Sequence, residues 1–512
     1  MRSQFQTGSR LSLVLGAGVS IDFGLPLWQK LVQRVANTAA VDGTSILNAA
    51  KKRGLPLTVT TQMLFERLRD RLASTYSLPK TSIILDRKAH FHFREIVRKC
   101  LYRYNAGNRL SHPYLQDLLP IIRRSQLTIN YNFDDCIERL LFKTRPPDDV
   151  DSRGCEVIVN ANTHFRRSNA IIYHPNGILP RNTVEIANEG LVFSEVTFAD
   201  QIFDSVSGYY STFHNHLTKN TCLLIGLSLD DGGLRHILRQ HARNNPGNIH
   251  YIIHHVRDGD TISPEYERSV ASSNFEVYNL YTLFLTSKQI AALGKLIARN
   301  DNLNVVTECE KLCPCRYIYY LAGVPGAGKS TSVGALKCFH TIDEWLEERP
   351  PEMLLRHTAL SPAARRRIDN WVRDQFFKKN RILAERKEGI SVVDRTPLDP
   401  LSFSDKSAVR GKAKAFRKTF RGERILDGQV LLFKGDFSEF ASRAESLGKQ
   451  SDPVYLSALD DLMRDVFGPN VVELNVEGMP KSHVIKAILR SIMFDEYIRT
   501  PLDERLAAAV KS

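Results

Sequence analysis

The sequence predicts an α/β protein made of two successive units, each built on a parallel sheet. Two glycine-rich loops carry this prediction: "VLGAGVSIDFGLP" at residues 14–26 and "LAGVPGAGKST" at residues 321–331. Each loop follows a short apolar run and precedes a helical pattern, and this order is typical of nucleotide-binding α/β folds. A chain of 512 residues also exceeds what one hydrophobic core normally serves.

The domain boundaries follow from the order of these patterns along the chain. A helical segment near residue 290 passes into "NDNLNVVTECEKLCPCR", and a new strand pattern, "YIYYLAG", begins at residue 317. The two halves show no internal repeat. We therefore expect a first domain at 1–290, a linker at 291–316 and a second domain at 317–512.

Short apolar runs predict the strands of the first unit, and several of them end in Gly, Asn or Ser. They lie at 11–16, 126–130, 170–177, 221–228 and 249–255. Helical patterns alternate with them, as expected for a Rossmann-like parallel sheet. The stretch from about 40 to 125 is mostly helical in pattern and predicts a helical insertion.

Composition narrows the class of protein further. The chain is 43% hydrophobic and 25% charged, as soluble globular proteins are. No apolar run approaches the ~20 residues that span a bilayer, so we expect a cytoplasmic protein without membrane contact. The eight cysteines are too few for a disulfide scaffold. Cys309, Cys313 and Cys315 lie closest together but lack paired C-x-x-C spacing, so we expect no zinc.

The formal net charge of +14 favours polyanionic partners. Part of it lies between residues 406 and 424, where basic residues recur at helical spacing: Lys406, Arg410, Lys414, Arg417 and Arg421. Three interpretations stay open: a solvated helix face, phosphate handling beside a nucleotide site, and contact with nucleic acid. Nucleic acid is not the favoured partner, because no interleaved aromatic pattern supports it.

Small and polar residues gather where the predicted strands of the first unit end. Gly16 and Gly18 follow the first strand, and backbone amides approach a diphosphate closely where no Cβ intervenes. Ser20 adds a hydroxyl donor. Each residue also has a structural interpretation, since Asn and Asp cap helices, Gly forms turns and buried His is often structural. Later strands end in the other members of this set, which are Asn132, Asp134, His174, Gly226 and Ser228.

In this order, the pieces resemble a Sir2-type NAD-consuming domain over roughly residues 10–285. The resemblance rests on "GAGVSIDFGLPLW", "NFDDCIE", "YHPNG" and "GLSLDD". It is to the prokaryotic Sir2-like family of antiviral defence rather than to the protein deacylases. The deacylases carry a four-cysteine zinc ribbon, which this chain lacks, and they continue the loop with Asp-Phe-Arg where it reads Pro26-Leu27-Trp28-Gln29. The resemblance therefore implies hydrolysis of the N-glycosidic bond of NAD.

The resemblance also implies a role for each member of the site. Asn132 would position the attacking water and hold a ribose hydroxyl, and Asp134 would support the ribose or the carboxamide. His174 would be the general base, directly or through a ribose hydroxyl. The remaining members would bind the rest of NAD: the diphosphate on Gly16, Ala17, Gly18 and Ser20, and the adenosine side on Gly226 and Ser228.

The second glycine loop fits the phosphate-binding pattern G-x-x-x-x-G-K-[ST] between a strand and a helical stretch. Its amides would cradle phosphates, Lys329 would bridge the terminal ones, and the Ser330 hydroxyl would bind Mg²⁺. Asp394, at the end of a later strand, can hold the metal's water shell or accept a proton, and Arg395 can bind a second phosphate. The predicted nucleotide set is Gly323, Gly326, Gly328, Lys329, Ser330, Thr331, Asp394, Arg395 and Arg443, with Ser330 and Asp394 as Mg²⁺ ligands.

Over about residues 317–490, the second unit resembles the small P-loop kinases. It is similar to thymidylate kinases in "VVDRTPLDP" and in "LLFKGDFSEFASRAESLGK". The resemblance implies ATP or another nucleotide with Mg²⁺, and a lid holding Arg443 and Lys449. Asp343 in "HTIDEW" either meets the acceptor or caps a helix.

The two loops have one joint interpretation, an NAD⁺ hydrolase that acts as an antiviral effector under the control of a nucleotide-binding, kinase-like domain. The sequence leaves open whether ligand binding releases the hydrolase or ATP holds it inactive. By analogy, we expect a homo-oligomer or a complex with a second defence protein. Two other function classes stay open: a nucleotide or small-molecule kinase with a non-catalytic NAD or ADP-ribose-binding module, and a nucleic-acid-binding assembly protein.

Overall fold

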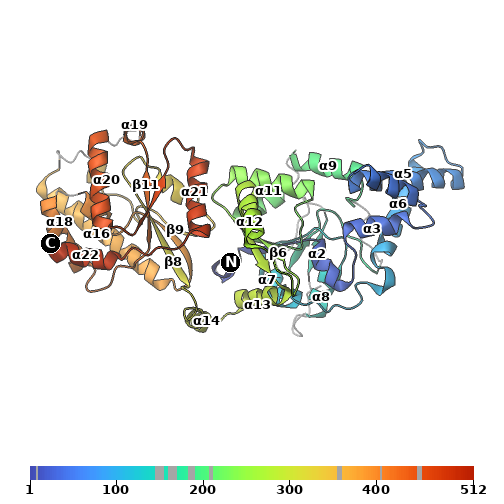
Figure 1. Cartoon of the computed structure of the whole chain (residues 1–512), viewed down its shortest axis with the longest axis horizontal. Helices are drawn as coiled ribbons and strands as arrows, with labels where there is room; N and C mark the ends of the chain where they lie inside the picture. The colour runs from blue at the N-terminus through green and yellow to red at the C-terminus, as the bar shows by residue number, and fades with distance from the viewer. Residues whose placement is uncertain are drawn as a thin grey trace. The chain divides into compact units, whose positions relative to one another are not determined.

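The chain forms two compact units in the computed structural model. The first is Met1–Asn244 with Ile249–Asn300, and the second is Asn245–Asn248 with Asp301–Ser512. Each unit has a parallel sheet with helices packed against it (Figure 1), which confirms the predicted α/β class. The structure describes residues 1–6, 10–144, 155–159, 170–182, 191–206, 211–354, 360–403, 406–446 and 452–511.

The first sheet has the strand order β3-β4-β2-β1-β5-β6-β7, and its described pairs are all parallel. Its strands are β1 Leu11–Leu15, β2 Thr128–Asn130, β3 Glu156–Ile158, β4 Ile171–Tyr173, β5 Thr221–Ile225, β6 His250–His255 and β7 Leu280–Leu285. The five predicted strands are confirmed, and β3 and β7 were not predicted. Only Asn279 separates β7 from the helix before it, so no cluster of turn residues marks its start.

Strand β1 lies in the middle of this sheet, and all five of its residues are buried. It pairs with β2 on one side and with β5 on the other. The chain therefore leaves β1 toward one side of the sheet and later returns on the other. In open α/β sheets, ligands bind at the carboxyl edge beside such a switch point.

The predicted helical insertion is confirmed between β1 and β2. Helices α5 and α6 pack together and bury Leu64, Leu68, Phe93 and Val97 in the core of the unit. The spacing of four within each pair puts both side chains on one face of the helix. The helices of this region are α3 Trp28–Ala36, α4 Thr44–Lys52, α5 Leu57–Tyr76, α6 Ile83–Leu101 and α7 Leu115–Arg124.

The other helices of the first unit flank the sheet or begin at its strand ends. They are α1 Arg2–Gln6, α2 Ala17–Ser20, α8 Cys136–Lys143, α9 Glu195–Val206, α10 Ser211–Lys219, α11 Gly232–Asn244, α12 Pro264–Tyr278 and α13 Ser287–Ala298, with 3₁₀ turns at Ile21–Phe23 and Arg103–Asn105.

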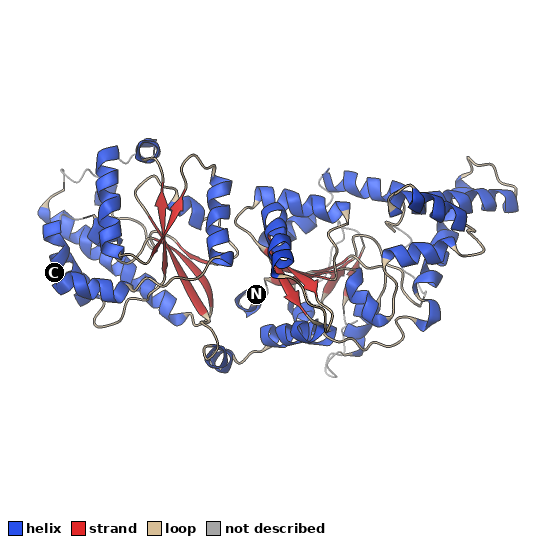
Figure 2. Cartoon of the chain, in the orientation of Figure 1, coloured by secondary structure: helices blue, strands red, loops and turns tan. Residues whose placement is uncertain are grey.

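The second sheet has the order β12-β11-β8-β10-β9, and its described pairs are again parallel. Figure 2 shows its strands between helices on both sides. The strands are β8 Arg316–Ala322, β9 His340–Ile342, β10 Gly389–Asp394, β11 Gln429–Lys434 and β12 Val471–Asn475. The helices are α14 Asn302–Cys309, α15 Lys329–Val333, α16 Pro362–Glu385, α17 Asp399–Ser402, α18 Lys406–Thr419, α19 Phe437–Ser446, α20 Pro453–Phe467, α21 Lys481–Phe494 and α22 Leu502–Lys511, with a 3₁₀ turn at Pro351–Leu354.

The stretch 291–316, predicted as a linker, contains the end of α13 and all of α14. The Asp301 side chain caps α14 by accepting a hydrogen bond from the Asn304 amide (3.3 Å), so this stretch has helical structure of its own. Among the described helices, none is both long enough and apolar enough to cross a membrane.

The basic stripe lies mostly on one helix, as its spacing predicts. Helix α18 ends at Thr419, and Arg421 follows it with a positive φ of 47°. Arg417 forms an ion pair with Asp503 (2.8 Å), whereas Arg410 and Lys414 are exposed. One member of the stripe is therefore tied to α22, and these two exposed members are solvated.

Candidate functional site

Parallel strands bring the predicted residues of the first unit to one edge of its sheet. Gly16 follows β1, Asn132 lies just beyond β2, His174 follows β4 and Gly226 follows β5. Because β4, β2, β1 and β5 are neighbours in the sheet, their carboxyl ends lie side by side. This edge includes the switch point at β1.

The three glycines at this edge are required by loop packing. A Cβ on Gly18 would lie 2.7 Å from the Gly226 Cα, and one on Gly16 would lie 2.6 Å from the Gly226 carbonyl oxygen. Gly226 itself has φ +68°, and a Cβ there would lie 2.5 Å from the Val19 amide nitrogen. The loops after β1 and β5 therefore touch through backbone atoms.

These contacts also occupy donors that were predicted to bind a diphosphate. The Gly16 amide donates to the Ile225 carbonyl (2.9 Å), and the Gly18 amide donates to the Gly226 carbonyl (2.8 Å). Neither amide can turn to a phosphate without losing its loop contact. Ala17, the remaining member of this turn, opens α2. The role of the glycine loop in NAD binding stays a prediction.

Asn132 is the best-positioned residue of the site. Its Nδ2 donates to the Gly16 carbonyl (3.0 Å), and its backbone amide donates to Asn130 Oδ1 (3.1 Å). The side chain is buried, and its Oδ1 has no hydrogen-bond partner. The buried Nδ2 of Asn130 has none either. Two amide groups at the switch point thus keep one acceptor and one donor unpaired, and a buried unpaired polar atom is costly unless a ligand or water satisfies it.

His174 forms a buried pair with Glu138, a residue that the sequence did not single out. The imidazole is fully buried; its Nδ1 donates to the Asn132 carbonyl (2.8 Å), and its Nε2 lies 2.7 Å from Glu138 Oε1. Burial lowers the pKa of His174, but the charge of Glu138 and the hydrogen bond to it outweigh burial, so the pKa lies above its ordinary value. In this arrangement, both ring nitrogens are occupied, and the predicted general base has no nitrogen available for water.

Glu138 lies in the first turn of α8, and one of its carboxylate oxygens, Oε2, is buried without a hydrogen-bond partner. In "DDCIERLLF" it resembles a solvent-facing residue of an amphipathic helix. The available signal was its place in the first turn of the helix that directly follows Asp134, a residue already placed at the site.

Asp134 and Ser20 bind each other. The Ser20 hydroxyl donates to Asp134 Oδ2 (2.6 Å), and the Cys136 amide donates to Oδ1 (3.1 Å). Burial raises the pKa of Asp134, while the hydrogen bond from Ser20 opposes this rise. The pair ties the loop after β1 to the start of α8, so both predicted ligand-binding groups have structural partners here.

Ser228 is exposed, two residues beyond Gly226. The next helix, α11, is capped by Asp231, whose Oδ1 accepts from the Leu234 amide (2.7 Å). Ser228 thus lies at the rim of the site, away from the buried group around Asn132.

In the second unit, the glycine loop follows β8 and leads into α15. Gly323, Gly326 and Gly328 all have positive φ, of 143°, 81° and 90°, and such a conformation favours glycine. Lys329 is buried and donates from Nζ to the carbonyls of Gly323 (2.7 Å) and Val324 (2.9 Å). Burial, followed by the charge of Arg395, lowers the pKa of Lys329 to about 8. The Lys329 ammonium is therefore bound by backbone carbonyls of the same glycine loop.

Asp394 ends β10, beside β8 in the sheet. It is fully buried, and neither carboxylate oxygen has a hydrogen-bond partner. Lys379 of α16, which the sequence did not single out, is also buried and donates from Nζ to the Asp394 carbonyl (2.9 Å). Burial lowers the pKa of Lys379 to about 8. This buried carboxylate accepts no hydrogen bond, although it interacts electrostatically with both Lys329 and Lys379. Its free oxygens are chemically suited to a bound cation or a donor hydroxyl.

The Arg395 guanidinium forms ion pairs with two carboxylates. Its Nε donates to Glu344 Oε1 (2.8 Å), its terminal nitrogen lies 3.5 Å from Asp399 Oδ2, and its φ is 71°. Glu344 is thus the acid of "HTIDEW" that faces this site, whereas the neighbouring Asp343 is exposed. Positive φ at a non-glycine residue is strained, so the surrounding contacts hold Arg395 in place.

The other predicted nucleotide residues are accessible. Ser330 and Thr331 are exposed at the start of α15. Arg443 lies on α19 and pairs with Glu439 on the same helix, and Lys449 lies outside the described residues. Ser330 and Asp394 both offer oxygen, which Mg²⁺ prefers, and Mg²⁺ takes few protein ligands when phosphates supply the rest. These residues therefore fit the predicted ion.

Within the described parts of the chain, no group of three or more His, Cys, Asp or Glu side chains is arranged to hold a metal ion. The described cysteines, Cys309, Cys313 and Cys315 among them, are free thiols.

The fold and these strand edges define an α/β protein of two units, each with a glycine-rich loop after a central strand of its sheet. Residues 126–279 match the SIR2-like domain family. This span holds Asn132, Asp134, Glu138 and His174, and it does not include the first glycine loop. The match supports an NAD-related function for the first unit. No curated protein sequence is significantly similar to the chain.

Two solved structures are similar to parts of the chain at low scores. A gluconokinase from Sinorhizobium meliloti 1021 is 18% identical, with a TM-score of 0.21, over 38% of this chain and 94% of its own. NadR protein in complex with NAD and AMP-PNP is 12% identical, with a TM-score of 0.27, over 73% of this chain and 88% of its own. At these scores, neither similarity bears on the activity of this chain.

Proposed function

We propose that the chain is an NAD⁺ hydrolase whose active site lies at the switch point of the first sheet. The observation that carries the proposal is the carboxamide of Asn132. One end of it is fixed on the Gly16 carbonyl, while its Oδ1 is buried without a partner. An oriented acceptor of this kind suits a ribose hydroxyl or the attacking water. The SIR2-like match over residues 126–279 supports NAD as the substrate.

The reaction breaks the bond between C1′ of the ribose and the ring nitrogen of nicotinamide. That electron pair leaves with nicotinamide, the water oxygen bonds to C1′, and a water proton is released, so NAD⁺ and water give nicotinamide, ADP-ribose and a proton. The ribose carries positive charge in the transition state, as in other glycoside hydrolyses. Asn132 orients the water or the ribose hydroxyl. The carboxylates of Glu138 and Asp134 stabilise the positive charge that develops on the ribose.

His174 could act in one of two ways, as a general base or as a positioning residue. The two roles differ in whether its contact with Glu138 is kept during the reaction. As a general base it must release one ring nitrogen, whereas as a positioning residue it keeps both contacts and holds the Asn132 peptide through Nδ1. A base makes kcat depend on the His174 pKa, while a positioning residue does not. Comparison of the pH–rate profiles of the parent and Glu138→Gln distinguishes the roles, because only a base shifts its profile when the carboxylate charge is removed.

For the second unit, we propose control of the hydrolase by ATP or another nucleotide with Mg²⁺, in an antiviral effector that works as a homo-oligomer or with a partner protein. Support for the nucleotide comes from the positive-φ glycine turn with its buried Lys329. The antiviral role and the assembly rest on the family resemblance alone.

The second candidate is a nucleotide or small-molecule kinase whose first unit binds NAD or ADP-ribose without chemistry. The buried, unpaired carboxylate of Asp394, one residue before Arg395, favours it. Such a carboxylate can accept a proton from an acceptor hydroxyl during phosphoryl transfer.

One experiment separates the two candidates. Purified full-length chain is incubated with NAD⁺ and Mg²⁺, alone and with a panel of ribo- and deoxynucleotides, and nicotinamide, ADP-ribose and nucleotide products are resolved by chromatography. The proposal predicts nicotinamide release whose dependence on nucleotide is lost in Lys329→Ala. Phosphorylated product without nicotinamide release, together with measurable NAD⁺ binding, would favour the kinase instead.

A further inference from the structure

We propose that the second unit carries an additional site for a phosphate-bearing small molecule, at the amino edge of its sheet and apart from the P-loop. Two adjoining cavities, of about 470 and 260 Å³, share Arg316 and Arg499 in their walls. The larger cavity is within the size range of pockets that hold small ligands.

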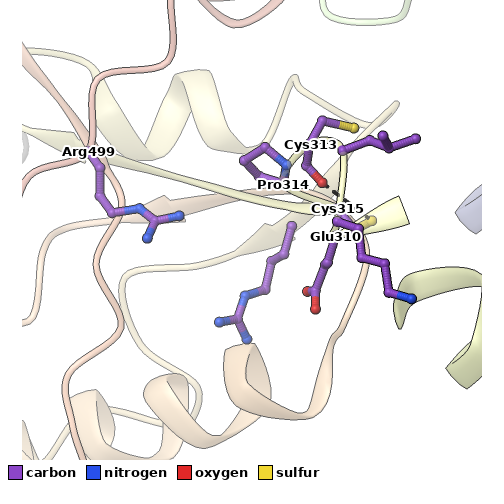
Figure 3. A pocket seen from close by; sticks show the side chains of 8 residues that line it. Glu310, Cys313, Pro314, Cys315 and Arg499 are labelled. Carbon is purple, nitrogen blue, oxygen red and sulfur yellow. Dashed lines mark hydrogen bonds between the residues drawn. The ribbon is translucent and has the colours of Figure 1, made fainter. Parts of the chain in front are cut away.

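The walls come from three separate segments of the unit. The turn from Glu310 to Cys315 enters β8 at Arg316, the segment from Arg424 to Asp427 leads into β11, and Arg499 lies before α22. Figure 3 shows Arg499 on one side of the larger hollow and Glu310, Cys313, Pro314 and Cys315 on the other.

Hydrogen bonds and close packing join β8, the segment before β11 and the segment that carries Arg499. The Thr500 amide donates to the Gly428 carbonyl (2.8 Å), and the Tyr497 hydroxyl donates to the Ile318 carbonyl (3.2 Å). A Cβ on Gly428 would lie 2.6 Å from the Ile318 carbonyl oxygen, so the segment before β11 lies directly against β8. Arg316 and Arg499 are therefore carried by segments that are fixed to each other.

The lining has an excess of positive charge. Four cations, Lys311, Arg316, Arg424 and Arg499, face two acids, Glu310 and Asp427, an excess of two. Among the described residues, no carboxylate forms an ion pair with Lys311, Arg316 or Arg499, and Arg424 lies 3.6 Å from Asp503. Arg316 Nη1 donates to the backbone carbonyls of Leu383 (3.3 Å) and Arg386 (3.4 Å), which leaves its charge without a carboxylate partner.

Several other cations of this unit have carboxylate partners: Arg395 with Glu344, Arg417 with Asp503 and Lys378 with Asp374. Cations without carboxylate partners around one hollow repel each other, and a phosphate group would offset that repulsion with charge-assisted hydrogen bonds. The chemistry of the lining therefore selects a phosphorylated ligand.

The site is distinct from the P-loop. Arg316 begins β8 and Gly323 follows its end, and a strand rises ~3.3 Å per residue, which puts the two sites roughly 20 Å apart along the strand. One nucleotide cannot contact both sites through a single triphosphate. The exposed basic residues of α18 are not part of the lining, which favours a small ligand in the hollow over a nucleic acid along a basic strip.

Cys313 offers a direct readout, because it is exposed and lines the larger cavity. Full-length protein under reducing conditions is treated with iodoacetamide, and peptide mass spectrometry follows alkylation of Cys313, with Cys309 as the internal reference. The probe is inorganic triphosphate without Mg²⁺. At four times its Kd, the rate at Cys313 should fall roughly fivefold, because about four fifths of the chains then hold the probe.

Three variants make the test specific. Lys311→Ala combined with Arg499→Ala removes two exposed cations and should abolish the protection. Lys329→Ala, in the P-loop, and Arg410→Ala, an exposed cation on α18, should keep it. Absence of protection in the parent, protection that survives the double substitution, loss of protection in Lys329→Ala, or protection by single-stranded RNA alone would each overturn the proposal.

Discussion

His174 Nε2 lies 2.7 Å from Glu138 Oε1, and both side chains are buried. The pair joins the end of β4 to α8, and through Nδ1 it also holds the Asn132 peptide. The pair therefore fixes the backbone of Asn132, whose side-chain Oδ1 has no partner, and so supports the candidate NAD site.

Loss of the Glu138 carboxylate should destabilise the first unit. Glu138→Ala leaves His174 buried without its partner, and breaking such a pair costs on the order of 3–5 kcal/mol. Glu138→Gln keeps a hydrogen-bonding group and should cost less.

The free energy of unfolding of this unit can be followed in urea by Trp28 fluorescence, in a chain with Trp345 and Trp371 replaced by Phe. Glu66→Ala, which removes a partly exposed pair with Arg69, is the control and should cost under ~1 kcal/mol; equal losses would contradict the assignment.

Gly18→Ala should disrupt the contact between the loops after β1 and β5. The new Cβ would lie 2.7 Å from the Gly226 Cα, and overpacking of this kind costs about 1–3 kcal/mol. Gly411→Ala is the matched control, since a Cβ there meets nothing within 4 Å and alanine favours a helix. Calorimetry should record a lower melting temperature only for Gly18→Ala. An unchanged melting temperature would mean that the two loops are not in contact.

The first unit should lose stability in acid because of a buried histidine cluster. His241 lies 4.9 Å from His250 between ring centroids, and burial lowers the pKa values of His216 and His241 to about 4. Between the unfolded pKa of about 6.5 and pH 4, the unfolded chain binds more protons than the folded one. The free energy of unfolding of the first unit is therefore highest above pH 6.5, where these histidines are neutral in both states. It falls as pH drops toward 4, by on the order of a few kcal/mol per histidine.

Urea unfolding by Trp28 fluorescence at pH 7 and pH 5 measures this loss. His241→Gln should flatten the pH dependence, because a neutral amide takes up no proton. A parent protein equally stable at both pH values would contradict the assignment of neutral histidines.

Nucleotide affinity of the second unit should fall in mildly alkaline solution. The pKa of Lys329 is about 8, so the lysine is charged at pH 7 and loses its charge as pH rises through 8. ADP binding measured by calorimetry should weaken by up to roughly tenfold per pH unit above 8. Lys329→Arg keeps its charge and should bind with little dependence on pH. The same slope in both proteins would exclude Lys329 as the titrating group.

Local patterns predicted the residues that directly follow strands. The glycine turns, Asn132, His174 and the P-loop lie at strand ends because parallel strands place their carboxyl ends at one edge, and that rule needs only sequence order. Glu138 and Lys379 were missed because their roles depend on which helix face packs on the sheet. Lys379 looks solvent-facing in "FFKKN", yet its ammonium reaches the end of β10.

The glycines show a different limit of sequence reasoning. Gly16 and Gly18 were predicted to give phosphate access, but their missing Cβ atoms make room for Gly226. A glycine pattern shows that something approaches the backbone closely, and only the three-dimensional contact shows whether that is a ligand or another loop.

The most direct test of the central claim is nicotinamide release from NAD⁺ by the full chain with Asn132→Ala, beside Asn108→Ala, an exposed asparagine of the same unit. If Asn132 orients the water or the ribose hydroxyl, Asn132→Ala abolishes release while the fold persists, and Asn108→Ala releases nicotinamide at the rate of the parent. Release at the parent rate from folded Asn132→Ala would contradict that role of Asn132.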